Sequence, residues 1–77
     1  MPKLSPIHYR LLCCVFERAG FRQVREEGSH LAYTKAGVPR PIMIPKYRAV
    51  PVFIIRNNLR TAGLSRDRYF QLLAECR

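Results

Sequence analysis

Apolar residues near the start of the chain recur at intervals of three and four positions, the pattern typical of a buried helix face. They are Leu11, Leu12, Val15, Phe16 and Ala19. Ser5 followed by Pro6 favours a helix start, with Ser5 as the N-cap and Pro6 at the first helical position. Gly20 favours the helix end, because glycine readily adopts the conformation that closes many helices. The pattern therefore predicts a first helix that ends at Gly20.

The next part of the chain alternates apolar and polar positions, which indicates β-strands. Residues 21–25 and 30–35 predict two strands joined by a turn over 26–29. Residues 41–44 predict a third strand between prolines, and residues 46–50 follow as a basic loop. Alternation divides the second strand into one face with Leu31, Tyr33 and Lys35 and another with His30, Ala32 and Thr34.

Two further helices are expected in the last third of the chain. Pro51 favours a start and Gly63 an end, although the β-branched run over 52–55 also fits a strand. The helical register decides for a helix, and its members are Val52, Ile55, Leu59 and Ala62. Ser65 predicts the cap of the third helix. The apolar face of this helix consists of Tyr69, Phe70, Leu73 and Cys76.

This order of elements defines the expected fold class. Strands joined by short turns pair antiparallel, and amphipathic helices bury their apolar stripes against a sheet. We expect an α+β domain over residues 1–77, with a three-stranded antiparallel sheet and the helices packed on one of its faces. The opposite face, with His30, is expected to stay open to solvent.

Charge points to the class of partner. The 77 residues carry 14 Lys or Arg against 5 Asp or Glu, for a formal net charge of +9. Most of the cations are Arg, whose planar guanidinium matches phosphate oxygens. Such a field attracts polyanions such as nucleic acids. An acidic protein partner also fits, whereas a membrane surface fits less well because the charges do not form one basic amphipathic face.

Other functional classes are excluded by what the sequence lacks. No apolar run is long enough to span a bilayer and no signal-peptide core is present, so we expect a cytoplasmic protein. The three cysteines, Cys13, Cys14 and Cys76, show no metal-binding spacing, and we expect them to be reduced core thiols. The carboxylates are scattered, so we expect no metal site. A chain of 77 residues is too short for a deep small-molecule cavity or a second, cofactor-binding domain, so we expect no cofactor.

Three motifs resemble those of the HicA toxins, the YcfA-like family of small mRNA interferases. They are Ala19-Gly20-Phe21, Gly28-Ser29-His30 and the segment Leu-Arg-Thr-Ala-Gly-Leu-Ser over 59–65. The resemblance extends from residue 11 to residue 73 and implies a fold like that of double-stranded-RNA-binding domains. It also implies that His30 is catalytic, that single-stranded RNA or mRNA is the substrate, and that a HicB-type antitoxin is the partner.

The chain departs from this family at two places. Many members have Pro-x-His after the third strand, where this chain has Pro45-Lys46-Tyr47. Many open the next helix with a segment like Lys-Gly-Thr, where this chain has Val-Phe-Ile over 52–54. The second histidine of the family pattern is therefore absent.

A single histidine can still cleave RNA, because RNA carries its own nucleophile in the ribose 2′-OH. A neutral imidazole can accept the 2′-OH proton as a general base without a metal ion. The other interpretation of His30 is a surface residue without a role. Cationic donors for the phosphorane are expected among Lys35, Arg40, Lys46 and Arg48.

The remaining candidates have structural alternatives. Tyr47 is a candidate proton donor or base-stacking platform, or a tyrosine packed on the helix start. Gly28 suits the turn backbone, and Ser29 bonds either a phosphate or its own turn. We expect His8 to be solvated. A solvated helix face with a possible role in docking an acidic partner consists of Arg56, Arg60, Arg66 and Arg68.

The sequence thus favours a metal-independent endoribonuclease toxin that uses His30. The first alternative is an RNA-binding module of the same fold without catalysis. The second is an interaction protein whose basic surface binds another protein.

Overall fold

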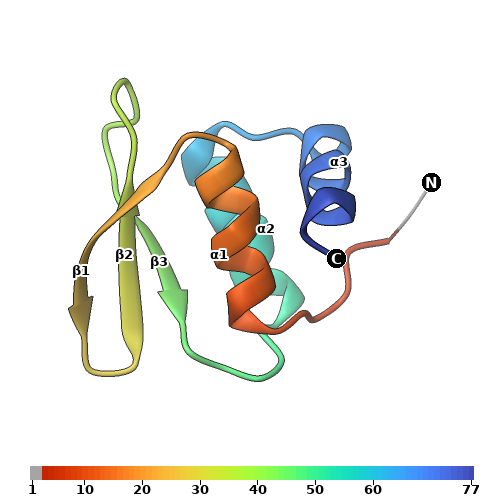
Figure 1. Cartoon of the computed structure of the whole chain (residues 1–77), viewed down its shortest axis with the longest axis horizontal. Helices are drawn as coiled ribbons and strands as arrows, with labels where there is room; N and C mark the ends of the chain where they lie inside the picture. Colours follow the sequence, from red (N-terminus) through yellow and green to blue (C-terminus); the bar gives the residue numbers. More distant parts are fainter. Residues whose placement is uncertain (1–2) are drawn as a thin grey trace.

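Three antiparallel strands form a sheet in the order β1-β2-β3, with three helices to one side of it (Figure 1). The structure is a computed structural model and describes residues 3–77. The elements are α1 (Tyr9–Arg18), β1 (Arg22–Glu27), β2 (His30–Thr34), β3 (Ile42–Pro45), α2 (Val52–Ala62) and α3 (Arg66–Cys76). The α+β class and the order of elements predicted from the sequence are confirmed.

Burial of one face of β2 and β3 joins the sheet to the helices. Leu31 pairs with Ile44 and Tyr33 with Ile42, and all of these side chains are buried. Helices α1 and α2 both pack against β3, and α3 packs on α1 (Figure 1). Strand β1 lies farthest from the helices, and each of its residues is exposed. The core therefore lies between β2, β3 and the helices.

The start of α1 differs from the prediction. Ser5 and Pro6 lie before the helix, and His8 is the N-cap, with its Nδ1 accepting a hydrogen bond from the Arg10 backbone N–H at 3.1 Å. Ile7, which lies between Pro6 and His8, forms an isolated β-bridge with Val50. Ile7 is buried, so pairing with a distant segment keeps this stretch extended and overrides the local start signal.

The first hairpin is tighter than predicted. Strand β1 continues to Glu27, so the turn contains only Gly28 and Ser29. The register of β1 with β2 shifts between Gln23 and Arg25, which is a β-bulge. Ala32, expected on the open face, is buried, because its short side chain lies between its strand neighbours Arg25 and Met43.

The last two helices follow their sequence signals closely. Gly63 closes α2 with φ of +67°, a conformation that glycine adopts without the steric cost of a Cβ. Ser65 caps α3 by accepting a hydrogen bond from the Arg68 backbone N–H. Leu72 is buried in α3 as well as the predicted Tyr69 and Leu73. Within residues 3–77, no helix has the length and apolar character that a membrane crossing requires.

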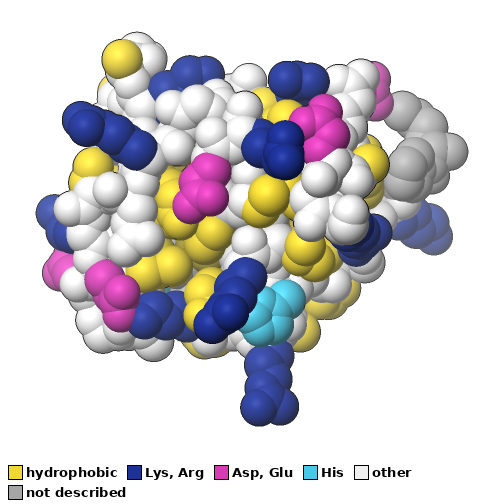
Figure 2. All heavy atoms as spheres, in the orientation of Figure 1, with side chains coloured by type: hydrophobic (Ala, Val, Ile, Leu, Met, Phe, Trp, Pro, Cys, Tyr) yellow, Lys and Arg dark blue, Asp and Glu magenta, His cyan; other side chains and the backbone are white. Residues whose placement is uncertain are grey.

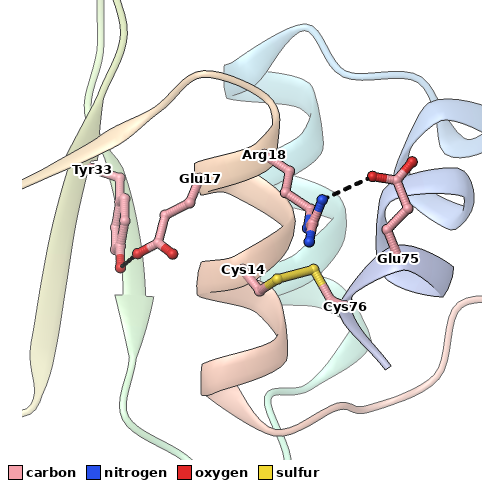
Figure 3. Close-up of a disulfide and its surroundings, with 6 residues drawn as sticks. All are labelled: Cys14, Glu17, Arg18, Tyr33, Glu75 and Cys76. Carbon is pink, nitrogen blue, oxygen red and sulfur yellow. Dashed lines mark hydrogen bonds and ion pairs between the residues drawn. A yellow bond between two sulfur atoms is a disulfide. The ribbon is translucent and has the colours of Figure 1, made fainter.

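Polar contacts fix α1 against β2. The Tyr33 hydroxyl donates to Glu17 Oε2 at 2.9 Å, from inside the core toward the helix surface (Figure 3). Burial raises the pKa of Tyr33 well above its usual value, so its phenol stays protonated and remains a donor. Lys35 Nζ donates to the Ala19 carbonyl at 2.8 Å and satisfies an acceptor at the end of α1.

The cysteines correct another prediction. Cys14 on α1 and Cys76 at the end of α3 form a disulfide, and only Cys13 is a free thiol (Figure 3). Neighbouring helix positions point in different directions, so Cys13 is buried while Cys14 faces α3. The two partners are 62 residues apart, and only the packing of α3 on α1 brings them together. The expectation of a reducing compartment rested on free thiols, and the disulfide removes that support.

We expect the disulfide to stabilise the domain strongly. A bond that closes a loop this long contributes about 2–4 kcal/mol, mainly by restricting the unfolded chain. In a domain of this size, that difference lowers the midpoint of thermal unfolding by at least about 10 °C when the bond is reduced. Circular dichroism melts with and without a thiol reductant measure it.

The matched control is the variant Cys14→Ser/Cys76→Ser, which should melt at the lower temperature and be insensitive to reductant. Thiol titration of the oxidised, denatured parent should find one free thiol, that of Cys13. Equal melting of the parent with and without reductant would contradict a stabilising disulfide.

Candidate functional site

Backbone hydrogen bonds fasten three segments together at one end of the molecule. The Lys46 N–H donates to the Ser29 carbonyl at 2.7 Å, which joins the loop after β3 to the β1–β2 turn. The Tyr9 N–H donates to the Tyr47 carbonyl at 3.1 Å, which joins the same loop to the start of α1. The turn, loop 46–50 and the starts of α1 and α2 therefore lie at one end, the lower end in Figure 1. We call it the turn end.

His30 lies at the turn end, as the first residue of β2. Its strand partners are Glu27 on β1 and Pro45 on β3. The side chain is exposed, and within residues 3–77 it has no hydrogen-bond or ion-pair partner. An imidazole in this position can accept a proton from a molecule that binds to the surface.

Gly28 provides the backbone geometry that the turn needs. Its φ is +57°, in the left-handed region that residues with a Cβ rarely adopt. A Cβ built at this position would meet no atom within 4 Å, so only backbone strain opposes a larger residue. Ser29 is exposed, and its carbonyl accepts the bond from Lys46.

The loop after β3 contributes one engaged cation and two exposed side chains. Lys46 Nζ forms an ion pair with Glu26, which partly neutralises it. Tyr47 is 45% exposed, so the phenol is open to solvent. Arg48 is exposed as well. Of these side chains, Tyr47 and Arg48 can meet a ligand directly, whereas Lys46 must first exchange its carboxylate partner.

The structure separates Lys35 and Arg40 from His30. Strand β2 runs from His30 to Thr34, so Lys35 follows the opposite end of the strand. There its ammonium group bonds Ala19 and lies 5.7 Å from the centre of the Phe21 ring. Arg40 precedes β3, whose start pairs with the end of β2. Neither residue belongs to the turn end.

Two residues at the turn end were not assigned to the site from the sequence. Glu27 was placed in a turn, but the longer β1 makes it the cross-strand neighbour of His30, where it forms an ion pair with Arg25 at 2.6 Å. His8 was expected to be solvated, but it caps α1 and stacks on the Tyr9 ring. The sequence signal that would have placed Glu27 in the strand, opposite His30, is a two-residue turn at Gly28 and Ser29.

The rest of the described chain offers no other reactive centre. Within residues 3–77, no three His, Cys, Asp or Glu side chains lie close enough to hold a metal ion together, and no pocket is enclosed. Burial raises the pKa of the Cys13 thiol, which keeps it protonated and unreactive. On the face of the molecule that Figure 2 shows, basic side chains are spread among acidic ones. The candidate site therefore lies on an open surface of the described chain.

Comparison with known families gave a match over most of the chain. A family model described as HicA toxin of bacterial toxin-antitoxin matches residues 9–64. The match begins at the first residue of α1 and includes the sheet, α2 and every candidate site residue, while α3 lies outside it. No curated protein and no solved structure gave a significant match.

We expect Gly28→Ala to destabilise the domain through backbone strain alone. A left-handed conformation costs a residue with a Cβ about 1 kcal/mol, which corresponds to about 5 °C in the melting midpoint. Gly28→Asn should cost less, because asparagine tolerates this conformation. Thermal melts of the two variants measure the difference. An alanine variant as stable as the parent would show that the turn does not require a left-handed residue.

Proposed function

Because the chain belongs to the HicA family of toxins from bacterial toxin-antitoxin systems, we propose that it is an endoribonuclease that cleaves mRNA through His30. The observation that carries the proposal is the position of His30, exposed and unpartnered where β2 begins. Family membership also implies an antitoxin partner, and we propose a protein of the HicB type. A substrate of mRNA implies action in the cytoplasm.

His30 acts as the general base in the proposed reaction. Its imidazole accepts the proton of a ribose 2′-OH, and the 2′-oxygen attacks the adjacent phosphorus. A bond forms between the 2′-oxygen and phosphorus while the bond to the 5′-oxygen breaks. The products are a strand that ends in a 2′,3′-cyclic phosphate and a strand with a free 5′-hydroxyl. No metal ion takes part.

The leaving 5′-oxygen needs a proton, and Tyr47 is the proposed donor. A phenol ordinarily keeps its proton at neutral pH, so it can act as an acid without being tuned. Tyr47 is exposed and lies two residues after Pro45, the strand partner of His30. Lys46 is a weaker candidate, because its ammonium group is paired with Glu26.

Arg48 and the backbone of the turn complete the proposed site. A guanidinium group beside the scissile phosphate stabilises the negative charge that develops in the transition state. Arg48 is exposed. The Gly28–Ser29 turn directly precedes His30, so its backbone groups lie near an RNA strand that binds at His30. This arrangement binds the substrate through phosphate and sugar, so it accepts single-stranded RNA.

The central test is His30→Ala. We expect this variant to lose RNA cleavage in EDTA and to lose toxicity on expression, while it melts like the parent because an exposed strand residue contributes little packing. Gel analysis of RNA incubated with the purified protein measures cleavage. His8→Asn is the matched control: it keeps the α1 cap and should still cleave.

Two results would contradict the proposal. Cleavage by His30→Ala at the parent rate would remove His30 from the mechanism. Binding of RNA by the parent without any cleavage would identify an RNA-binding module instead of an enzyme.

A second test concerns Tyr47. Tyr47→Phe should slow cleavage at least about tenfold if the phenol donates the proton, because general acid catalysis contributes at least about a hundredfold and water replaces part of it. Tyr47→His should restore activity, with a rate that falls again above neutral pH, since an imidazolium donor is lost there. Cleavage rates of the three proteins across pH measure both effects. An unchanged rate for Tyr47→Phe would assign the proton to another group.

A further inference from the structure

The solvent face of α2 carries one aromatic ring, one amide and two guanidinium groups in a line. These side chains are Phe53, Arg56, Asn57 and Arg60. Their spacing of three and four residues places them on one helix face. All are exposed, whereas the buried residues of α2 are Ile55, Asn58 and Leu59. We call the exposed line the α2 stripe.

The cations of the α2 stripe are not neutralised. Helix α2 contains neither Asp nor Glu. In the part of the chain that the structure describes, Arg56 and Arg60 form no ion pair or side-chain hydrogen bond. By contrast, Arg18 and Arg25 each pair with a glutamate. The stripe therefore keeps its positive potential for a partner outside the chain.

Phe53 has no role in the core. Its side chain is 63% exposed, the largest value among the exposed large hydrophobic residues. It is the second residue of α2, two positions after the N-cap Pro51, and it is exposed. An exposed ring followed by arginines on the same helix face is a combination with which proteins hold single-stranded nucleic acids, since bases stack on aromatic faces while cations follow the phosphates.

We propose that the α2 stripe is a second RNA contact surface, on which Phe53 stacks one base and Arg56 and Arg60 bind phosphates. This inference rests on the proposed function and extends it to the RNA beyond the scissile bond. Arg56 and Arg60 are one helical turn apart, a rise of about 6 Å, so each can reach a different phosphate of one strand. Asn57, between them, can bond a base edge.

Charge and polarity favour RNA over a protein partner. The centre of a stable protein interface is depleted in charge and mostly apolar, whereas nucleic-acid interfaces are polar and strongly positive. The α2 stripe has a single apolar member, and the whole chain carries a net charge of +9.

The stripe also begins close to the candidate site. Helix α2 starts directly after loop 46–50, and Val50 is tied to Ile7 at the turn end. Phe53 therefore lies toward the turn end, and Arg60 toward the opposite end of α2 (Figure 1). A strand cleaved at His30 can extend along the helix.

The test is the binding of a single-stranded RNA oligonucleotide whose 2′-hydroxyls are methylated, so that it cannot be cleaved. Fluorescence anisotropy should show about tenfold weaker binding for Phe53→Ala. With an oligonucleotide that lacks bases, Phe53→Ala and the parent should bind with equal affinity. Arg56→Gln/Arg60→Gln should bind at least about tenfold more weakly, and its plot of log K against log salt should be shallower by about 1.4, for two lost phosphate contacts.

The matched control is Arg68→Gln/Arg77→Gln, which removes the same charge from the α3 region and should bind almost like the parent. Equal weakening by both double variants would show that only net charge matters and would overturn the proposal. So would unchanged RNA binding by the stripe variants together with lost binding to poly-glutamate, which would assign the stripe to an acidic protein. Failure of the parent to bind or cleave any RNA would instead overturn the proposed function itself.

Discussion

The orientation of the candidate site depends on the burial of one face of β2. Leu31 and Tyr33 are buried against the helices, and side chains in a strand alternate between faces with a period of two. A slip of one residue would expose both and bury His30, so the apolar contacts lock the register. Tyr33 adds a directional constraint through its hydrogen bond to Glu17 on α1. The exposure of His30 is thus a consequence of core packing, although His30 contributes nothing to the core.

The distribution of the acidic residues explains where the positive charge is available. Each glutamate contacts another side chain of the same molecule. Glu17 accepts a hydrogen bond from Tyr33, and Glu26, Glu27 and Glu75 form ion pairs with cations. Since these partners lie on the sheet, in loop 46–50 and on α1, they lower the positive potential there and leave α2 without a counter-charge. A net charge alone would suggest a uniformly basic body. Of the three helices described, α2 is the one that carries arginines and no carboxylate.

Sequence signals predicted correctly those features that depend only on residues close together in the chain. Gly63 ends α2 as the sequence predicted, because a left-handed closing residue needs no distant partner. The predicted start of α1 was wrong because Ile7 pairs with Val50, which is far along the chain. The Cys14–Cys76 disulfide was missed for the same reason, since only helix packing joins residues so distant in sequence.

The candidate site shows the same division. His30 and the turn before it could be found from a short motif, but the length of β2 decides which cations lie near His30. That length separates Lys35 from the turn end, and the extension of β1 to Glu27 places Glu27 opposite His30. The pairing of the strands, which the residue pattern of a single strand does not specify, sets both positions.

Backbone hydrogen bonds hold the turn end together, so its side chains can vary. Its segments are joined by backbone groups: the Ser29 carbonyl, the Tyr47 carbonyl and the Ile7 carbonyl each accept a backbone N–H. Substituting a side chain there leaves these bonds in place, provided that the backbone conformation is allowed. The scaffold therefore tolerates different side chains at position 47. Stability depends on the core and on the disulfide between α1 and α3, so the chemistry at the turn end can change without loss of the fold.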